Sequence, residues 1–153
     1  MEALTEDLVE EVFGLMKLNM QSLFEERNGP WDDEKIRKNF IGHNCILVKR
    51  KGSVAGFSFY ELKENEIYIH TLQISPEYQH RTMGGQFFKW FRNLAASTNS
   101  NAISCRVYDS NPAYGLYKRI GFEEVSTVEG LVEMVLPLAH QLKTRRSVCS
   151  THR

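Results

Sequence analysis

The chain has 153 residues, 42% apolar and 25% charged, which is enough for one domain with a hydrophobic core. Nineteen basic residues balance nineteen acidic ones, and this neutrality excludes electrostatic attraction to nucleic acid as a property of the whole chain. The three cysteines are widely spaced, without the spacing of zinc ligands, so we expect reduced thiols and no metal.

The two ends of the chain differ in charge. Residues 1–34 carry ten acids and two bases, whereas residues 139–153 carry four Lys and Arg and no acid. The first ten residues carry acidic residues and no basic one, whereas a signal peptide begins with basic residues. No apolar run is long enough to span a bilayer, so we expect a cytoplasmic protein without membrane contact. Residues 139–153 lack helical or strand periodicity and predict a basic tail after a single domain over residues 1–138. Four bases without interleaved aromatics argue against a nucleic-acid partner.

Apolar periodicity predicts two helices first. Thr5 is a suitable N-cap for a helix whose apolar stripe runs from Leu8 to Phe24 and which ends at Asn28-Gly29-Pro30. A second, short helix follows Trp31-Asp32-Asp33.

Strands and helices then alternate. The predicted strands are Cys45–Arg50, Val54–Glu61, Ile67–Ile74, Ile103–Val107, Phe122–Val128 and Leu131–Leu136. A strongly amphipathic helix runs from Met83 to about Ala96, and another begins at Asn111-Pro112 and ends before Gly121. This order predicts an α/β (α+β) fold with a mixed sheet covered by helices.

The segment from Ser75 to Gly85 joins a strand to the amphipathic helix. The first amides of a helix have no partner inside it and lie at the positive end of the helix dipole, and Gly84 and Gly85 allow close approach of a ligand. The segment therefore predicts an anion site, although its spacing alone is equally typical of a turn that binds nothing. It is not a Walker A loop.

Two motifs here resemble those of the GNAT acetyltransferase family. The stretch Ile74-Ser75-Pro76-Glu77-Tyr78-Gln79-His80-Arg81-Thr82-Met83-Gly84 is similar to the family's first signature, and Ala113–Phe122 is similar to the end of its second. The resemblance covers roughly residues 4–136. It implies an acyl-CoA N-acyltransferase-like fold with a mostly antiparallel central sheet flanked by helices. Only Met1–Leu4 are left for the family's first strand, which we expect to be short or absent.

The resemblance implies acetyl-CoA as co-substrate, without a metal. Its pyrophosphate would lie on the loop amides and its pantetheine arm beside the strand before the loop, in the splay between that strand and Ile103–Val107. The implied cofactor-binding residues are Leu72, Gln73, Ile74, Gln79, His80, Arg81, Thr82, Met83, Gly84, Gly85, Asn111 and Tyr114. Thr82 stands where the family has a glycine. Asn111 is offset by one position from the family's asparagine, and as the residue before Pro112 it is better suited to cap a helix.

The resemblance also implies a proton donor. Tyr117 matches the family's tyrosine near the thioester sulfur, where a phenol can protonate the leaving thiolate; a core tyrosine is the alternative. Glu66 and His70 are candidate bases for the acceptor amine by their position on the third predicted strand. Their ordinary roles would be a charge at the end of a hairpin and a packed polar side chain.

The resemblance implies that the acceptor binds beside the first two helices, and acidic residues concentrate in this part of the sequence. Trp31, Asp32 and Glu26 are the candidate substrate residues, and their field would favour a small, cationic primary amine that attacks acetyl-CoA directly in a ternary complex. Simple capping of helix ends by these acids is the competing interpretation.

Two other functions stay open: a degenerate CoA-binding or regulatory module, and a peptide or protein N-acetyltransferase. An open sheet edge would also permit a homodimer.

Overall fold

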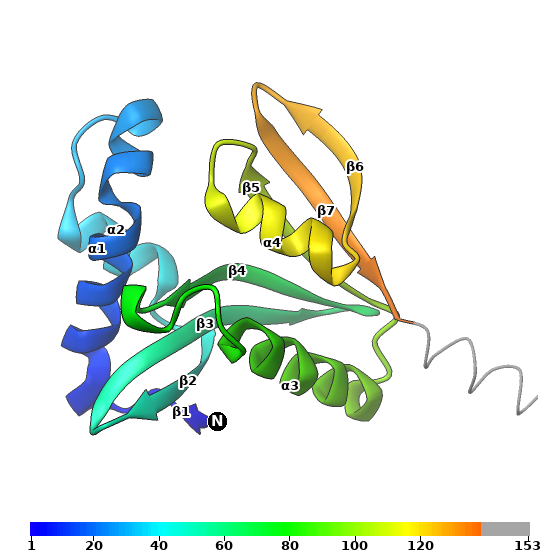
Figure 1. The fold of residues 1–153 in the computed structure, drawn as a ribbon, viewed down its shortest axis with the longest axis horizontal. Coiled ribbons are helices and arrows are strands. Elements are labelled where there is room, and N and C mark those ends of the chain that lie inside the picture. Colours follow the sequence, from blue (N-terminus) through cyan, green and yellow to red (C-terminus); the bar gives the residue numbers. More distant parts are fainter. Residues whose placement is uncertain (139–153) are drawn as a thin grey trace, which may run out of the picture. The chain divides into compact units, whose positions relative to one another are not determined.

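The computed structural model describes residues 1–138, and the predicted basic tail, residues 139–153, lies outside the described residues (Figure 1). The helices are α1 Val9–Asn28, α2 Asp33–Phe40, α3 Met83–Thr98 and α4 Pro112–Ile120, with 3₁₀ turns η1 Glu6–Leu8 and η2 Pro76–Tyr78. The strands are β1 Glu2–Ala3, β2 Asn44–Arg50, β3 Ser53–Lys63, β4 Glu66–Ile74, β5 Ala102–Tyr108, β6 Glu123–Val128 and β7 Leu131–Pro137. Among residues 1–138, no helix has the length and apolar character needed to cross a membrane.

The strands pair in the order β1-β2-β3-β4-β5-β7-β6. The β4–β5 pair is parallel, while β1–β2, β2–β3, β5–β7 and β6–β7 are antiparallel. The predicted fold class, a mixed and mostly antiparallel sheet flanked by helices, is confirmed. The first strand is indeed short, because only Glu2 and Ala3 pair with β2.

The predicted start of the first helix is wrong in detail. The Thr5 side chain accepts no amide of the first turn; its hydroxyl instead donates to the carboxylate of Asp7. The chain therefore enters α1 through the 3₁₀ turn η1, and the α-helix begins only at Val9.

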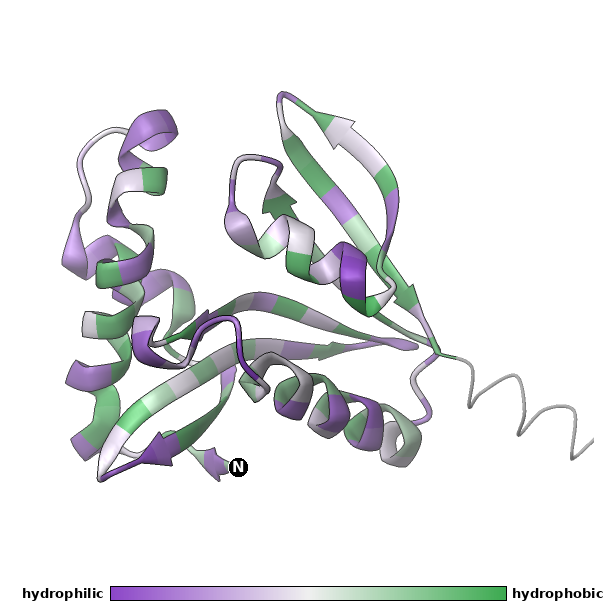
Figure 2. Ribbon diagram, viewed as in Figure 1, coloured by the Kyte–Doolittle hydropathy of each residue, from purple (hydrophilic) through white to green (hydrophobic). Residues whose placement is uncertain are grey.

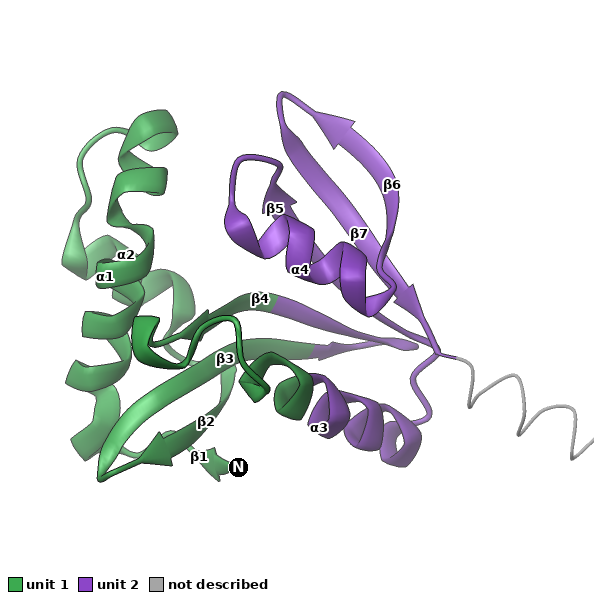
Figure 3. Cartoon of the chain, in the orientation of Figure 1, with its two compact units in different colours: residues 1–61, 70–87 green, residues 62–69, 88–153 purple. Residues whose placement is uncertain are grey.

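The chain forms two compact units (Figure 3). Unit 1 comprises residues 1–61 and 70–87, and unit 2 comprises residues 62–69 and 88–153. Strands β3 and β4 and helix α3 each contribute residues to both units.

In unit 1, the two faces of β3 carry different contacts. Phe57 and Phe59 are buried on one face in a cluster that includes Phe13 of α1 and Ile36 of α2. Because side chains alternate along a strand, Gly56 points to the other face, where its nearest neighbours include Met83 and Phe87 of α3. Figure 2 shows hydrophobic residues along both β3 and α1. The packing on β3 thus fixes the first turns of α3.

In unit 2, strand β5 lies between β4 and β7, and its side chains Ile103, Cys105 and Val107 are buried. Burial raises the pKa of the Cys105 thiol to about 12, so this cysteine is an unreactive core residue at neutral pH. The same effect raises the pKa of Cys45 in unit 1 to about 12. Both are free cysteines, as predicted; Cys149 lies outside the described residues.

Candidate active site

The loop between β4 and α3 is held at both of its ends by hydrogen bonds within unit 1. The Ser75 amide donates to the Ala55 carbonyl at 2.8 Å, and the Gln79 side-chain amide donates to the Ile74 carbonyl at 2.9 Å. Between them, Pro76 begins the 3₁₀ turn η2. The Gln79 side chain therefore shapes the loop. Its main-chain amide donates to the Pro76 carbonyl at 3.4 Å, which leaves the residues after Gln79 for ligand contacts.

The residues that follow lead into the N-terminus of α3. Gln79 is extended, and His80 has a φ of 62°, in the left-handed region, so the chain turns sharply before the helix begins. Within residues 1–138, the first α3 amide bonded back along the main chain is that of Gln86, to the Thr82 carbonyl at 3.1 Å. A Cβ added at Gly85 would meet no heavy atom within 4 Å. The protein leaves room there for a ligand.

The last residues of β4 are anchored to α1. Asn19 donates to the Ile74 carbonyl at 2.9 Å and to the Gln73 side chain at 3.1 Å, and Gln73 is buried. Leu72 is half-buried. The ladder between β4 and β5 runs from Glu66–Ala102 to Ile69–Cys105, and β4 continues beyond it to Ile74.

The two other predicted cofactor contacts lie in or beside α4. The Asn111 side chain accepts the Ala113 amide at 2.9 Å, so Asn111 is the N-cap of α4, as its place before Pro112 favoured. The Tyr114 hydroxyl donates to Glu124 and accepts from Lys118 at 3.3 Å. Both side chains are engaged in contacts within unit 2.

Tyr117 lies in the core of unit 2. It is 4% exposed, and its ring contacts Phe88 and Phe122 at centroid distances of 6.0 and 5.2 Å. Burial, with a smaller contribution from Cys105, raises the pKa of its hydroxyl well above the ordinary value. The hydroxyl therefore stays protonated at neutral pH and can donate a hydrogen bond.

The two candidate bases have different surroundings. Glu66 begins β4 and lies opposite Ala102 in the parallel ladder. The His70 Nε2 atom lies 3.4 Å from a carboxylate oxygen of Glu61, and its ring lies 4.2 Å from that of His43. Sequence reasoning named His70 but missed Glu61 and His43, because partners across strands depend on register. The available signal was a histidine on each side of the Val54–Glu61 strand.

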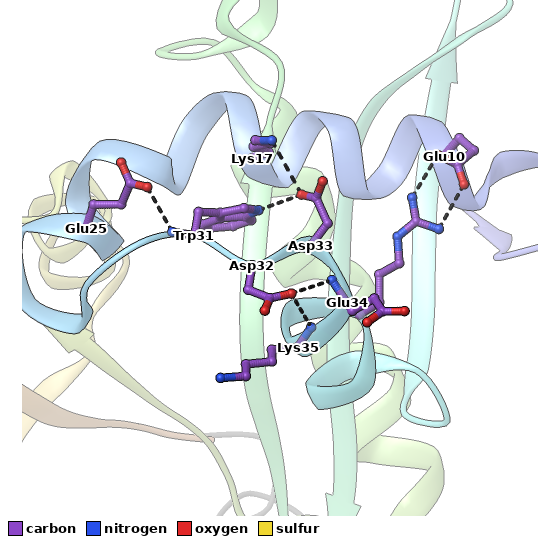
Figure 4. A network of polar contacts seen from close by, with 9 residues as sticks. Glu10, Lys17, Glu25, Trp31, Asp32, Asp33, Glu34 and Lys35 are labelled. Atoms are coloured by element: carbon purple, nitrogen blue, oxygen red, sulfur yellow. Dashed lines mark hydrogen bonds and ion pairs between the residues drawn. The ribbon is translucent and has the colours of Figure 1, made fainter.

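The two aspartates that begin α2 already have partners (Figure 4). Asp32 caps α2 by accepting the Glu34 and Lys35 amides at 3.0 and 3.2 Å. Asp33 accepts the Trp31 indole N–H at 2.9 Å and lies 3.5 Å from Lys17.

Other predicted or neighbouring side chains complete this network. The Trp31 amide donates to Glu25 at 2.8 Å, the Trp31 ring packs on Phe24, and Glu26 is exposed. Glu10 binds Arg37 with two hydrogen bonds. A hollow of about 150 Å³ in unit 1 is lined by Trp31 together with these two ion pairs, Lys17–Asp33 and Glu10–Arg37. Its lining therefore balances two acids with two bases, instead of presenting the acidic field that the sequence suggested.

Comparison with known families gives one match that covers most of the chain. The model described as "Acetyltransferase (GNAT) domain" matches residues 23–135. A Bacillus subtilis (strain 168) protein named "Putative ribosomal protein bS18-alanine N-acetyltransferase" is 24% identical over 98 residues, which are 61% of this chain. The aligned part spans 65% of that relative's length.

Solved structures share the fold. The Escherichia coli ribosomal-protein-S18-alanine N-acetyltransferase superposes with a TM-score of 0.69 at 17% identity, over 90% of this chain and 92% of that one. An aminoglycoside 6′-N-acetyltransferase solved with coenzyme A gives a TM-score of 0.70 at 12% identity, over 88% of this chain and 92% of that one. At such identities, the likeness concerns the fold alone.

Proposed function

Since the chain belongs to the GNAT acetyltransferase family, we propose that it transfers the acetyl group of acetyl-CoA to a primary amine, and that this amine is the N-terminal α-amine of a polypeptide. The observation that carries the first part is the loop of residues 80–85, in which left-handed His80 leads into the α3 amides that precede the first one bonded back along the chain, that of Gln86. Acetyl-CoA, when bound, supplies the activated acyl group. This chain's residues hold the coenzyme, orient the amine and handle two protons.

The loop suits a diphosphate for three reasons. The α3 amides before that of Gln86 are available to a ligand, the α3 dipole adds positive potential, and Gly85 leaves the approach open. Arg81 and Thr82 are exposed beside these amides and can add a charge and a hydroxyl donor, so Thr82 is compatible with binding. The end of β4, at Leu72, Gln73 and Ile74, is proposed to align the pantetheine arm.

Coenzyme binding can be tested with a glycine variant whose two effects have opposite signs. We expect Gly85→Ala to raise the melting temperature, since alanine is favoured over glycine in a helix by about 1 kcal/mol and the space is open. The same methyl should weaken acetyl-CoA binding roughly tenfold, about 1.4 kcal/mol, because it intrudes on the phosphate approach. Calorimetry and thermal unfolding measure the two effects.

The matched control is Gly14→Ala in α1, where an added Cβ also meets no heavy atom within 4 Å. It should stabilise the protein without changing acetyl-CoA affinity. For the wild type, acetyl-CoA at a hundred times its Kd should add about 2.7 kcal/mol of stability. No binding at millimolar acetyl-CoA, or equal affinity in wild type and Gly85→Ala, would contradict the proposed coenzyme site.

The acceptor proposal is supported by the balanced charges around the α1–α2 hollow. Asp32 caps a helix and Asp33 pairs with Lys17, so these two carboxylates attract a small cationic substrate less than the acidic sequence predicts. An N-terminal α-amine, with a pKa near 7.8, is about one-tenth neutral at pH 7, whereas an alkylamine near 10.4 is neutral in less than one part in 10³. The α-amine therefore demands far less from a base. The names of two relatives, alanine acetyltransferases of a ribosomal protein, agree with this class.

Proton handling is assigned to three groups. His70 and Glu66 are the proposed proton acceptors for the amine, with Glu61 orienting His70 at 3.4 Å. Tyr117 is the proposed donor to the leaving thiolate. Its raised pKa suits a hydrogen bond that stabilises the thiolate better than complete proton transfer.

The acceptor class can be measured by release of free thiol. We expect peptides with a free N-terminal amine to react with a kcat/KM at least about tenfold above that of polyamines or aminoglycosides, a difference of about 1.4 kcal/mol. A matched peptide with a blocked N-terminus and an internal lysine should be inert. Preference for a polyamine would restore the small cationic acceptor. Coenzyme binding without turnover on any amine would indicate a degenerate binding module.

A further inference from the structure

Three potential metal ligands converge in unit 1. His43 precedes β2, Glu61 lies on β3 and His70 lies on β4. One carboxylate oxygen of Glu61 faces both imidazoles, 3.6 Å from His43 Nδ1 and 3.4 Å from His70 Nε2. The ligand atoms of all three lie within 4.8 Å of one another.

The sheet brings these residues together by register. Asn44 pairs with Tyr60 in the β2–β3 ladder, so His43 and Glu61 lie side by side just beyond its end. Strands β3 and β4 are neighbours in the sheet, and the imidazole rings of His43 and His70 lie 4.2 Å apart at 30°. The pairing of the strands thus determines how close the three residues lie, without the contribution of a long loop.

The separations match those of a tetrahedral ion. Zinc lies about 2.0–2.2 Å from nitrogen and oxygen ligands, which places any two ligands roughly 3.4 Å from each other. Two of the three edges already have this length, at 3.4 and 3.6 Å. The third edge, at most 4.8 Å, needs to shorten by no more than about 1.4 Å, which side-chain rotations can supply.

Exposure leaves room for exchangeable ligands. The side chains of His43, Glu61 and His70 are 30%, 38% and 25% exposed, so an ion would be reached from solvent and keep a water molecule. The Glu61 carboxylate faces both imidazoles, so it adds a negative charge that attracts a cation to this point. A metal ion can bind all three ligand atoms at once.

We propose that His43, Glu61 and His70 form a binding site for a divalent transition-metal ion, of which Zn²⁺ is the representative. Two imidazoles and one carboxylate suit zinc, whereas Mg²⁺ and Ca²⁺ prefer sets made of oxygen atoms. The fourth position is open to water. Cysteine spacing predicted no metal, and it could not reveal this cluster, because the three ligands come from separate elements that the sheet brings together.

Titration of the full chain with ZnCl₂ in a calorimeter tests the site. We expect one strong site per chain, with MgCl₂ giving no comparable heat, and Co²⁺ giving the visible absorption of a low-symmetry site. His43→Ala, Glu61→Gln and His70→Ala should each weaken Zn²⁺ binding at least about 100-fold, since removing even an outer-shell partner costs 10–100-fold. Thermal unfolding without metal verifies that each variant folds, and its stabilisation by Zn²⁺ should be lost.

The control variant replaces the two histidines and the cysteine of residues 139–153, which are other candidate metal ligands. The triple variant His140→Ala/Cys149→Ser/His152→Ala should keep the full affinity. Loss of Zn²⁺ binding in this variant, with retention in His43→Ala and His70→Ala, would overturn the proposal, as would no binding by the wild type. If His70 also acts as a base, which rests on the proposed function, bound Zn²⁺ should slow acetyl transfer; the binding measurements do not depend on that outcome.

Discussion

Replacement of Tyr117 by phenylalanine is expected to lower kcat for acetyl transfer by about 10²–10⁴-fold, the range typical of a lost proton donor. The fold should survive, because the ring keeps its contacts with Phe88 and Phe122 and only the hydroxyl is removed. Acetyl-CoA affinity should change little, since the hydroxyl matters when charge develops on the sulfur. Single-turnover thiol release and calorimetry separate these two quantities.

The control for this variant is Tyr68→Phe, which removes the hydroxyl of another tyrosine of unit 2 and leaves its ring over Lys63. Its kcat should equal that of the wild type.

A further readout is the dependence of the wild-type rate on pH. Burial raises the pKa of Tyr117, so the wild type should show no loss of rate from its ionisation at neutral or mildly alkaline pH. Wild-type kcat in Tyr117→Phe would make Tyr117 a core residue only.

Local patterns in the sequence predict the elements of this protein well. Asp32 and Asn111 each cap a helix, and Gly121 ends α4 with a left-handed φ of 118°. These features depend on a residue and its nearest neighbours along the chain, which is why the sequence is sufficient for them. Thr5 is the exception, because its hydroxyl donates to Asp7 and accepts no amide of the turn that follows.

Contacts between segments far apart in the chain could not be predicted from the sequence. The acidic residues near α1 and α2 predict attraction of a cation, but Lys17 pairs with Asp33 and Arg37 pairs with Glu10. Arg37 and Glu10 are 27 residues apart in the sequence. The cluster of His43, Glu61 and His70 was missed for the same reason. Charge sums count residues without their partners, and partners across helices or strands are set by register and packing.

Gly56→Ala is expected to lower the free energy of unfolding by about 1–3 kcal/mol, the usual cost of overpacking a core. A Cβ at this position would lie 2.9 Å from the Met83 Sδ atom, 3.1 Å from the Phe87 ring and 3.2 Å from the Gln73 carbonyl oxygen. The methionine sulfur can move aside, but the buried ring and the β4 main chain cannot do so without displacing their neighbours. Chemical denaturation measures the loss.

The same substitution should weaken acetyl-CoA binding, because Met83 and Phe87 lie in the first turns of α3, whose amides form the proposed phosphate site. Gly115→Ala in α4 is the matched control: its nearest heavy atom would be an Arg119 nitrogen at an ordinary 3.6 Å, so it should be stable and bind normally. In the double variant Gly56→Ala/Met83→Ala the steric conflict is partly relieved, and the two changes should couple by about 0.5–3 kcal/mol. Wild-type stability in Gly56→Ala would mean that α3 does not depend on close contact with β3, and the phosphate loop would then owe its position to the bonds at Ser75 and Gln79 alone.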